Sequence, residues 1–191
     1  VPGDIRSVNV SLNNITANYN DSWGVLVDTN GAVSWVKGEA SHNGLSSSYT
    51  SGGASIMNDR AAELASKPVI IRDVMLNNNL RNDGINISTR GGVTLANIQV
   101  IDNYYEGVSL FKYTGAGNIL LTNVTADGNM YGIDITASST VPRYNNVTLI
   151  NVSASNNDGF GISVGANGTI TWTGGAVLNN SKTMVQNNVS L

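Results

Sequence analysis

The feature that most constrains this chain is a three-residue pattern that recurs seven times: a β-branched residue, any residue, then a large apolar residue. The copies are Val10-Ser11-Leu12, Val33-Ser34-Trp35, Val69-Ile70-Ile71, Val93-Thr94-Leu95, Ile119-Leu120-Leu121, Val147-Thr148-Leu149 and Ile170-Thr171-Trp172. Successive copies are 23, 36, 24, 26, 28 and 23 residues apart. Repeats of this length are typical of solenoids, in which each repeat packs only against its neighbours.

Two further positions support this register when the β-branched residue of each copy is numbered 0. Position +10 is asparagine in every copy, although it played no part in the alignment: Asn20, Asn43, Asn79, Asn103, Asn129, Asn157 and Asn180. A side-chain amide both donates and accepts hydrogen bonds, so stacked asparagines can bond one another along a column. Position +4 predicts a second, partial ladder from Asn14, Asp73, Asn97, Asn123 and Asn151.

A third short segment follows each asparagine and begins with glycine. The glycines are Gly24, Gly53, Gly84, Gly107, Gly132 and Gly161. We expect three short strands per repeat, with positions 0, +2, +5 and +7 in the core and with each of these glycines at a positive φ. One repeat cannot bury its apolar side chains alone, but stacked repeats can, each strand pairing in parallel with its copy about 4.8 Å away.

This consensus resembles the pectate-lyase-like superfamily of right-handed parallel β-helices over about residues 8–191. The resemblance implies an all-β, single-stranded right-handed solenoid of about seven coils, forming one domain over residues 1–191. It also suggests a polysaccharide lyase or glycoside hydrolase as the first function to test. The longest repeat contains an insertion, about residues 57–68, that is predicted to be a short helix with Asn58 as N-cap and Pro68 as its stop.

The sequence offers few candidates for catalytic residues. The outward positions of the third strand carry one carboxylate, Asp134, and no acidic cluster emerges there. The single histidine, His42, has no second histidine and no obvious nucleophile partner, and Asp127 and Asp158 occupy different positions of the coil from Asp134. We therefore expect no catalytic residue, no metal site and no cofactor.

Charge and hydropathy exclude two classes of partner. Charged residues make up only 12% of the chain, and its net charge is −3, so a basic nucleic-acid surface is not expected. No apolar run reaches the roughly 18–20 residues needed to cross a bilayer. The chain has no cysteine, which excludes disulfides and thiolate metal sites.

Aromatic residues gather just before the third strand, at Trp23, Tyr105, Tyr131 and Phe160. Stacked on one another, they would form a ridge along one corner of the solenoid. Two interpretations stay open: the rings cover the bend, or they form a platform on which sugar rings pack.

Glycosylation sequons are the other abundant signal. The pattern N-x-[ST] occurs at Asn9, Asn14, Asn20, Asn86, Asn123, Asn146, Asn151, Asn167, Asn179 and Asn188. The ladder positions would be sequestered, which leaves Asn9, Asn86, Asn146, Asn167, Asn179 and Asn188 as candidates for attached glycans. These sequons favour an extracellular or cell-surface location.

The last residues, Asn188-Val189-Ser190-Leu191, repeat Asn9-Val10-Ser11-Leu12. Exposed strand edges recruit other chains, so two explanations are open: a piece of a longer β-helix, or head-to-tail stacking of identical subunits. The residues expected at such a junction are Val10, Leu12, Trp172, Val189 and Leu191. The sequence thus predicts a structural protein, the protomer of a surface filament, with a carbohydrate-active or glycan-binding adhesin segment as the alternative.

Overall fold

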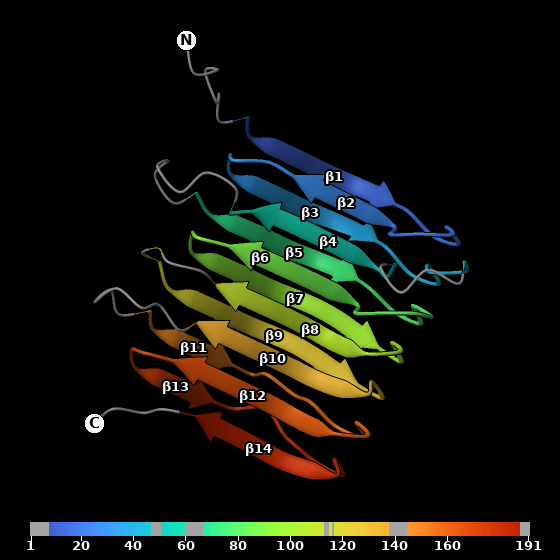
Figure 1. Cartoon of the computed structure of the whole chain (residues 1–191). Helices are drawn as coiled ribbons and strands as arrows, with labels where there is room; N and C mark the ends of the chain where they lie inside the picture. Colours follow the sequence, from blue (N-terminus) through green and yellow to red (C-terminus); the bar gives the residue numbers. More distant parts are fainter. Residues whose placement is uncertain are drawn as a thin grey trace.

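The computed structural model describes residues 8–46, 51–59, 67–112, 115, 117–137 and 145–187. All regular structure in these residues is parallel β-sheet, and none of them is helical. The chain winds as a β-solenoid, so the predicted all-β parallel fold is confirmed. Figure 1 shows the strands stacked in chain order from the N-terminal to the C-terminal coil.

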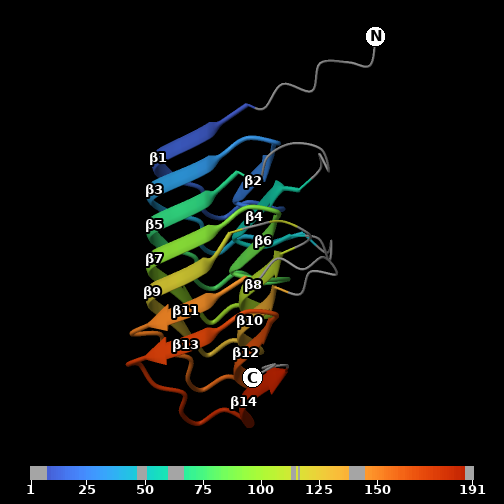
Figure 2. The same cartoon turned by 90° about the vertical axis from the view of Figure 1, so that its left-hand side faces the viewer.

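Two parallel sheets form the walls of the solenoid, each taking one strand from every coil (Figure 2). Sheet A holds β1 (Val10–Thr16), β3 (Val33–Glu39), β5 (Val69–Met75), β7 (Val93–Ile101), β9 (Ile119–Asp127), β11 (Val147–Ile150) and β13 (Ile170–Thr173). Sheet B holds β2 (Val25–Asp28), β4 (Ala54–Asn58), β6 (Ile85–Thr89), β8 (Glu106–Lys112), β10 (Tyr131–Ala137), β12 (Phe160–Ala166) and β14 (Lys182–Asn187).

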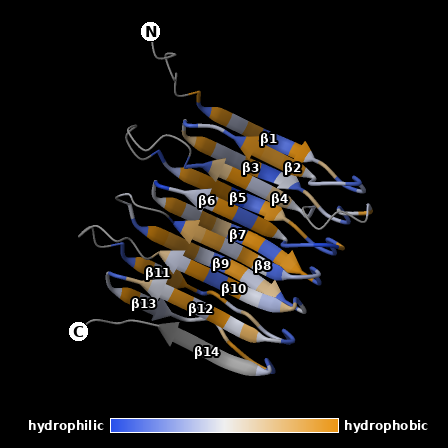
Figure 3. Cartoon of the chain, in the orientation of Figure 1, coloured by the Kyte–Doolittle hydropathy of each residue, from blue (hydrophilic) through white to orange (hydrophobic). Residues whose placement is uncertain are grey.

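The predicted register is confirmed residue by residue. Leu95 pairs with Leu121, and Leu121 pairs with Leu149, as copies of position +2. In the inner coils positions 0, +2, +5 and +7 are buried, apart from the half-buried Gly38, and they form one continuous core with the inward residues of sheet B. Figure 3 shows the result as apolar bands along the strands, with hydrophilic residues gathered at the bends.

The expectation of three strands per coil is wrong in one respect. The first and second predicted strands run on as one strand in β1, β3, β5, β7 and β9. The bend between them is a single left-handed residue at position +4, which turns the strand without ending it. In the structure every copy of this position has a positive φ: Asn14, Lys37, Asp73, Asn97, Asn123, Asn151 and Gly174.

A second left-handed column ends the sheet A segment at position +9. It holds Tyr19, His42, Asn78, Asp102, Gly128, Asn156 and Asn179. Together the two columns account for every non-glycine residue with positive φ in the described part of the chain, all between 53° and 60°. Asparagine and aspartate tolerate this conformation better than other L-residues, which explains why both columns are rich in them.

The insertion of the second coil lies mostly outside the described residues, because residues 60–66 are not among them. The proposed N-cap of its helix is placed differently from the prediction. Asn58 ends strand β4 and pairs with Thr89 of β6. Its Nδ2 donates to the backbone oxygen of Lys67 at 3.0 Å, so the side chain joins the two ends of the insertion.

Candidate functional site

The asparagine ladder at position +10 is continuous through all seven coils. Each Nδ2 donates to the Oδ1 of the asparagine in the next coil, at 2.8–3.3 Å. The same Oδ1 also accepts the backbone N–H of the preceding asparagine, at 2.9–3.1 Å. From Asn43 to Asn157 the ladder side chains are buried, so the ladder joins successive coils and offers no binding surface.

The six glycines at or just before the start of the sheet B strands leave room for this ladder. None of the six has a positive φ, so the predicted reason for glycine is wrong. A Cβ atom built on any of them would lie 2.5–3.0 Å from the Nδ2 of a ladder asparagine in the following coil. Glycine is required there because side-chain amides approach the backbone closely.

Four of the five residues predicted for the second ladder form it on the outside of the solenoid; the fifth, Asn14, is separated from them by Lys37 in the second coil. Asn151 donates to Asn123, Asn123 to Asn97, and Asn97 to Asp73, at 2.7–3.1 Å between Nδ2 and Oδ1. These donors point toward the N-terminal coil, whereas those of the inner ladder point toward the C-terminal coil. The outer ladder ends on a carboxylate, which is an acceptor only.

The bend that follows the inner ladder carries exposed apolar side chains in successive coils. Leu80, Tyr104 and Met130 each come directly after a ladder asparagine in three successive coils, and Tyr105 lies beside them. These four side chains are between 40% and 60% exposed. We call them the corner strip. Large contiguous apolar patches are rare on monomeric proteins, and the largest patch on a protein often binds a partner.

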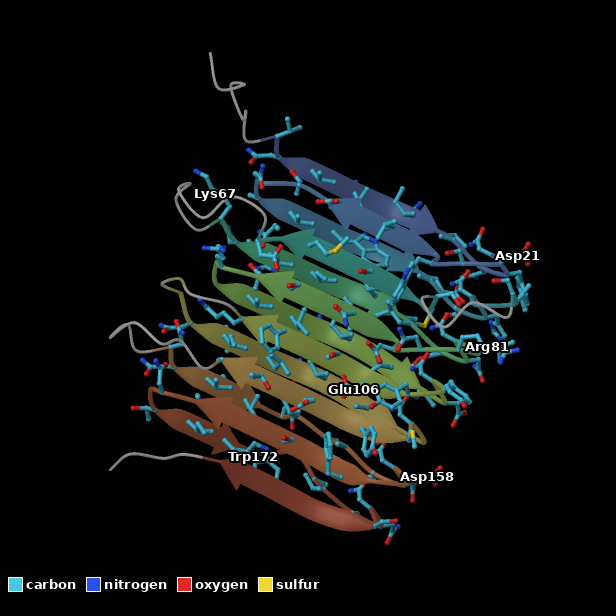
Figure 4. The ribbon with its side chains drawn as sticks, in the orientation of Figure 1. Asp21, Lys67, Arg81, Glu106, Asp158 and Trp172 are labelled. Atoms are coloured by element: carbon cyan, nitrogen blue, oxygen red, sulfur yellow. The ribbon has the colours of Figure 1, made fainter. Side chains whose placement is uncertain are left out.

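Two carboxyl groups lie beside the corner strip at the entrance to sheet B. Asp83 precedes Gly84, Glu106 precedes Gly107, and the two residues occupy neighbouring coils. The Asp83 carboxylate accepts the backbone N–H of Glu106 at 3.1 Å and the Nδ2 of Asn86 at 3.2 Å. We call Asp83 and Glu106 the carboxyl pair; Figure 4 labels Glu106 on the face of the solenoid, with Arg81 and Asp158 on the corner.

Burial perturbs both members of the carboxyl pair. Asp83 is 3% exposed, and its burial raises its pKa to about 6. Burial raises the pKa of Glu106 to about 7, with further contributions from the charges of Asp83 and Asp134, while a hydrogen bond from Ser109 opposes the rise. The pKa of the neighbouring Tyr105 phenol is raised by burial and then by Glu106. The site therefore resists further negative charge.

The carboxyl pair was not among the residues expected from the sequence. The prediction was based on the outward positions of the third strand, and the carboxyl pair lies one position before it. The loop between the ladder asparagine and the glycine varies in length. The residues that directly precede the glycines therefore do not align when positions are counted from the first strand. They align when positions are counted back from the glycine, and the residues one position before it are Trp23, Gly52, Asp83, Glu106, Tyr131 and Phe160.

The predicted aromatic ridge forms in part. Tyr131 stacks on Phe160 with ring centroids 4.7 Å apart, and Tyr105 meets Tyr131 edge to face at 5.3 Å. Trp23 is separate, since its ring covers Gly52 in the next coil. His42 stacks on Tyr19 at 4.9 Å, away from the carboxyl pair.

The opposite end of β8 holds a buried cation that the sequence did not indicate. Lys112 is fully buried, and its Nζ donates to the backbone oxygens of Arg90 at 3.1 Å and Gly115 at 2.8 Å. Burial lowers its pKa to about 8. Because its partners are backbone oxygens of neighbouring bends, Lys112 joins those bends.

The candidate glycosylation sites differ in how their amides are used. Asn9 and Asn146 are exposed, and each accepts the backbone N–H of the next coil through Oδ1, from Ala32 and Thr169. Asn86 and Asn179 instead use Nδ2, the atom that would carry a glycan, as a donor. Asn167 accepts a backbone N–H through Oδ1, and Asn188 lies outside the described residues.

The residues expected at a stacking junction are placed as follows. Val10 and Leu12 of β1 are half-buried, and Trp172 of β13 is 39% exposed, so the core is less covered at the outer coils. Val189 and Leu191 lie outside the described residues.

No known protein family matches the chain, and neither the curated proteins nor the solved structures contain a significant match to it. In the described part of the chain no three His, Cys, Asp or Glu side chains are grouped so as to hold a metal ion. The same residues include no helix of the length and hydropathy that a membrane crossing requires.

Proposed function

We propose that this chain is a glycan-binding segment of an extracellular protein, built as a right-handed β-helix of the pectate-lyase-like superfamily. The observation that carries the proposal is the corner strip, with four partly exposed apolar side chains in three successive coils. Coils follow one another at about 4.8 Å, so the strip offers a repeating line of contacts to a polymer that lies along the solenoid axis.

The chemistry of the strip suits a sugar chain. Aromatic and aliphatic side chains pack on the apolar faces of pyranose rings, while Glu106, Ser109 and Asp134 offer polar atoms beside them. The exposed sequons at Asn9 and Asn146 support an extracellular location, because N-linked glycans are added in the secretory route.

We propose further that the segment binds without catalysis. Glycosidases also have two carboxyl groups, which flank the bond that they cleave. Asp83, however, is almost fully buried and holds Asn86 and a backbone N–H, which leaves it no access to a substrate. Hydrolysis of a bound glycan that is abolished by Glu106→Gln would overturn this part.

Binding to a panel of soluble oligosaccharides, measured by titration calorimetry, tests the proposal. We expect Tyr104→Ala to weaken binding by about tenfold, because a ring contact of about 1.4 kcal/mol is lost. The matched control is Tyr19→Ala, which removes an exposed tyrosine of the first coil that lies off the strip. Equal binding by both variants, or no binding to any oligosaccharide, would contradict the proposal.

A second candidate function is structural, a filament of identical chains stacked head to tail. The observation that favours it is the partial exposure of core positions in the outer coils, Leu12 and Trp172. A β-solenoid buries such positions when another coil pairs with it, whether that coil belongs to the same polypeptide or to another.

A further inference from the structure

The ionisable groups beside the corner strip are mostly carboxyl groups. Asp83 and Glu106 lie beside it, and Asp134 of β10 pairs in register with Ser109, the residue that hydrogen-bonds Glu106. Asp158 follows the ladder asparagine of the next coil, in the same column as Leu80 and Tyr104. Arg81, labelled on the same corner in Figure 4, is the one cation in this group of described residues.

We propose that the polymer held by the corner strip carries protonated amino groups, so that its ligand class is an amino-sugar polysaccharide. This inference rests on the proposed glycan binding and adds the charge of the ligand. An ammonium group is attracted both by carboxylates and by the faces of tyrosine rings, and Tyr104, Tyr105 and Glu106 are consecutive residues.

The alternatives fit the site less well. A uronate would bring a further carboxylate next to Glu106, whose pKa is raised first by burial and then by the charges of Asp83 and Asp134. A neutral sugar would leave that charge uncompensated. An ammonium group offsets it and favours the ionised form of Glu106, so Glu106 and Asp134 each gain a partner on binding, whereas the buried Asp83 does not reach the ligand.

The experiment compares oligosaccharides of equal length under conditions in which the amine is protonated: glucosamine, N-acetylglucosamine, glucose and galacturonate oligomers. We expect the glucosamine oligomer to bind at least about tenfold more tightly than its N-acetylated form. We also expect this preference to shrink as salt is raised, because the contacts beside the strip are partly exposed.

Glu106→Gln and Asp134→Asn should each lower the preference several-fold while the far-UV spectrum and melting temperature show that the variants are folded. Glu39→Gln, a carboxylate removed from β3 of sheet A, is the matched control and should leave it unchanged.

The outcomes separate the two proposals. Equal affinity for free and acetylated amines, still lost in Tyr104→Ala, overturns the charge of the ligand and leaves glycan binding intact. Binding of no oligosaccharide overturns glycan binding itself. Polylysine that binds as tightly as the glucosamine oligomer overturns the assignment to a sugar.

Discussion

At the scale of single residues, position +4 of every coil requires a left-handed backbone conformation. Lys37 occupies position +4 of the second coil with a φ of 59°, where the other copies are asparagine, aspartate or glycine. A left-handed residue that is not Asn, Asp or Gly costs roughly 1–2 kcal/mol. We expect Lys37→Asn to raise the free energy of unfolding by about 1 kcal/mol. Urea denaturation should show this gain, whereas Arg72→Asn, an exposed site in ordinary strand geometry on β5, should show none.

The glycine column gives a second test at this scale. A Cβ on Gly107 would lie 2.7 Å from the backbone oxygen of Gly132 and 2.8 Å from Nδ2 of Asn129. Because both are held by the neighbouring coil, we expect Gly107→Ala to destabilise by about 1–3 kcal/mol, as overpacking does. Gly165→Ala is the control, since its nearest neighbour would be 3.8 Å away. Equal thermal stability of the two variants would refute the steric explanation.

At the scale of structural elements, the inner ladder couples the coils. Asn129 Oδ1 accepts two hydrogen bonds from Asn103, and its Nδ2 donates to Asn157 and to the backbone oxygen of Val100. Asn129→Leu leaves these buried partners unpaired, at about 1–3 kcal/mol each. We expect a marked drop in melting temperature. The same substitution at Asn20, the exposed first rung of the column, should cost far less.

The carboxyl pair makes the free energy of unfolding depend on pH. The pKa values of Asp83 and Glu106 are about 6 and 7 in the folded chain, above the values of 3.8 and 4.5 for free carboxyls. The native state therefore binds more protons than the unfolded state between about pH 4 and 7, so their contribution to stability falls as pH rises through this range. Melting temperatures of the double variant Asp83→Asn/Glu106→Gln should fall less over this range than those of the unchanged chain. A parallel pH profile in both proteins would refute the assignment; Asp158→Asn, an exposed carboxylate, is the control.

At the scale of the whole molecule, stacking between solenoids is a prediction that the outer coils make testable. If a further coil binds over Trp172, we expect purified chains to form particles whose long axis follows the solenoid, with a rise of roughly 34 Å for seven coils at about 4.8 Å. Trp172→Asp would place a charge in that contact and should yield monomers in light scattering. Unchanged chains that stay monomeric at high concentration would contradict the filament.

The sequence predicts the parts of this molecule that repeat. Asn129 could be recognised because an amide ladder needs the same residue in every coil, and Leu121 because a core column needs similar volumes. Asp83 and Glu106 could not, since their column holds a different residue type in most coils and is reached through loops of unequal length. The close approach that requires Gly107 also escaped detection, because it depends on where a neighbouring amide lies.

The inner ladder has one further consequence, for the growth of such a molecule by gene duplication. Each coil offers the next an amide oxygen on one side and amide donors on the other, so the ladder residues of any two coils match. A duplicated segment such as residues 93–118, one full coil, would therefore find ladder partners above and below it without a substitution at position +10. The length of the solenoid would then change in units of one coil. The number of coils before the corner strip would set the position of the strip along the solenoid axis.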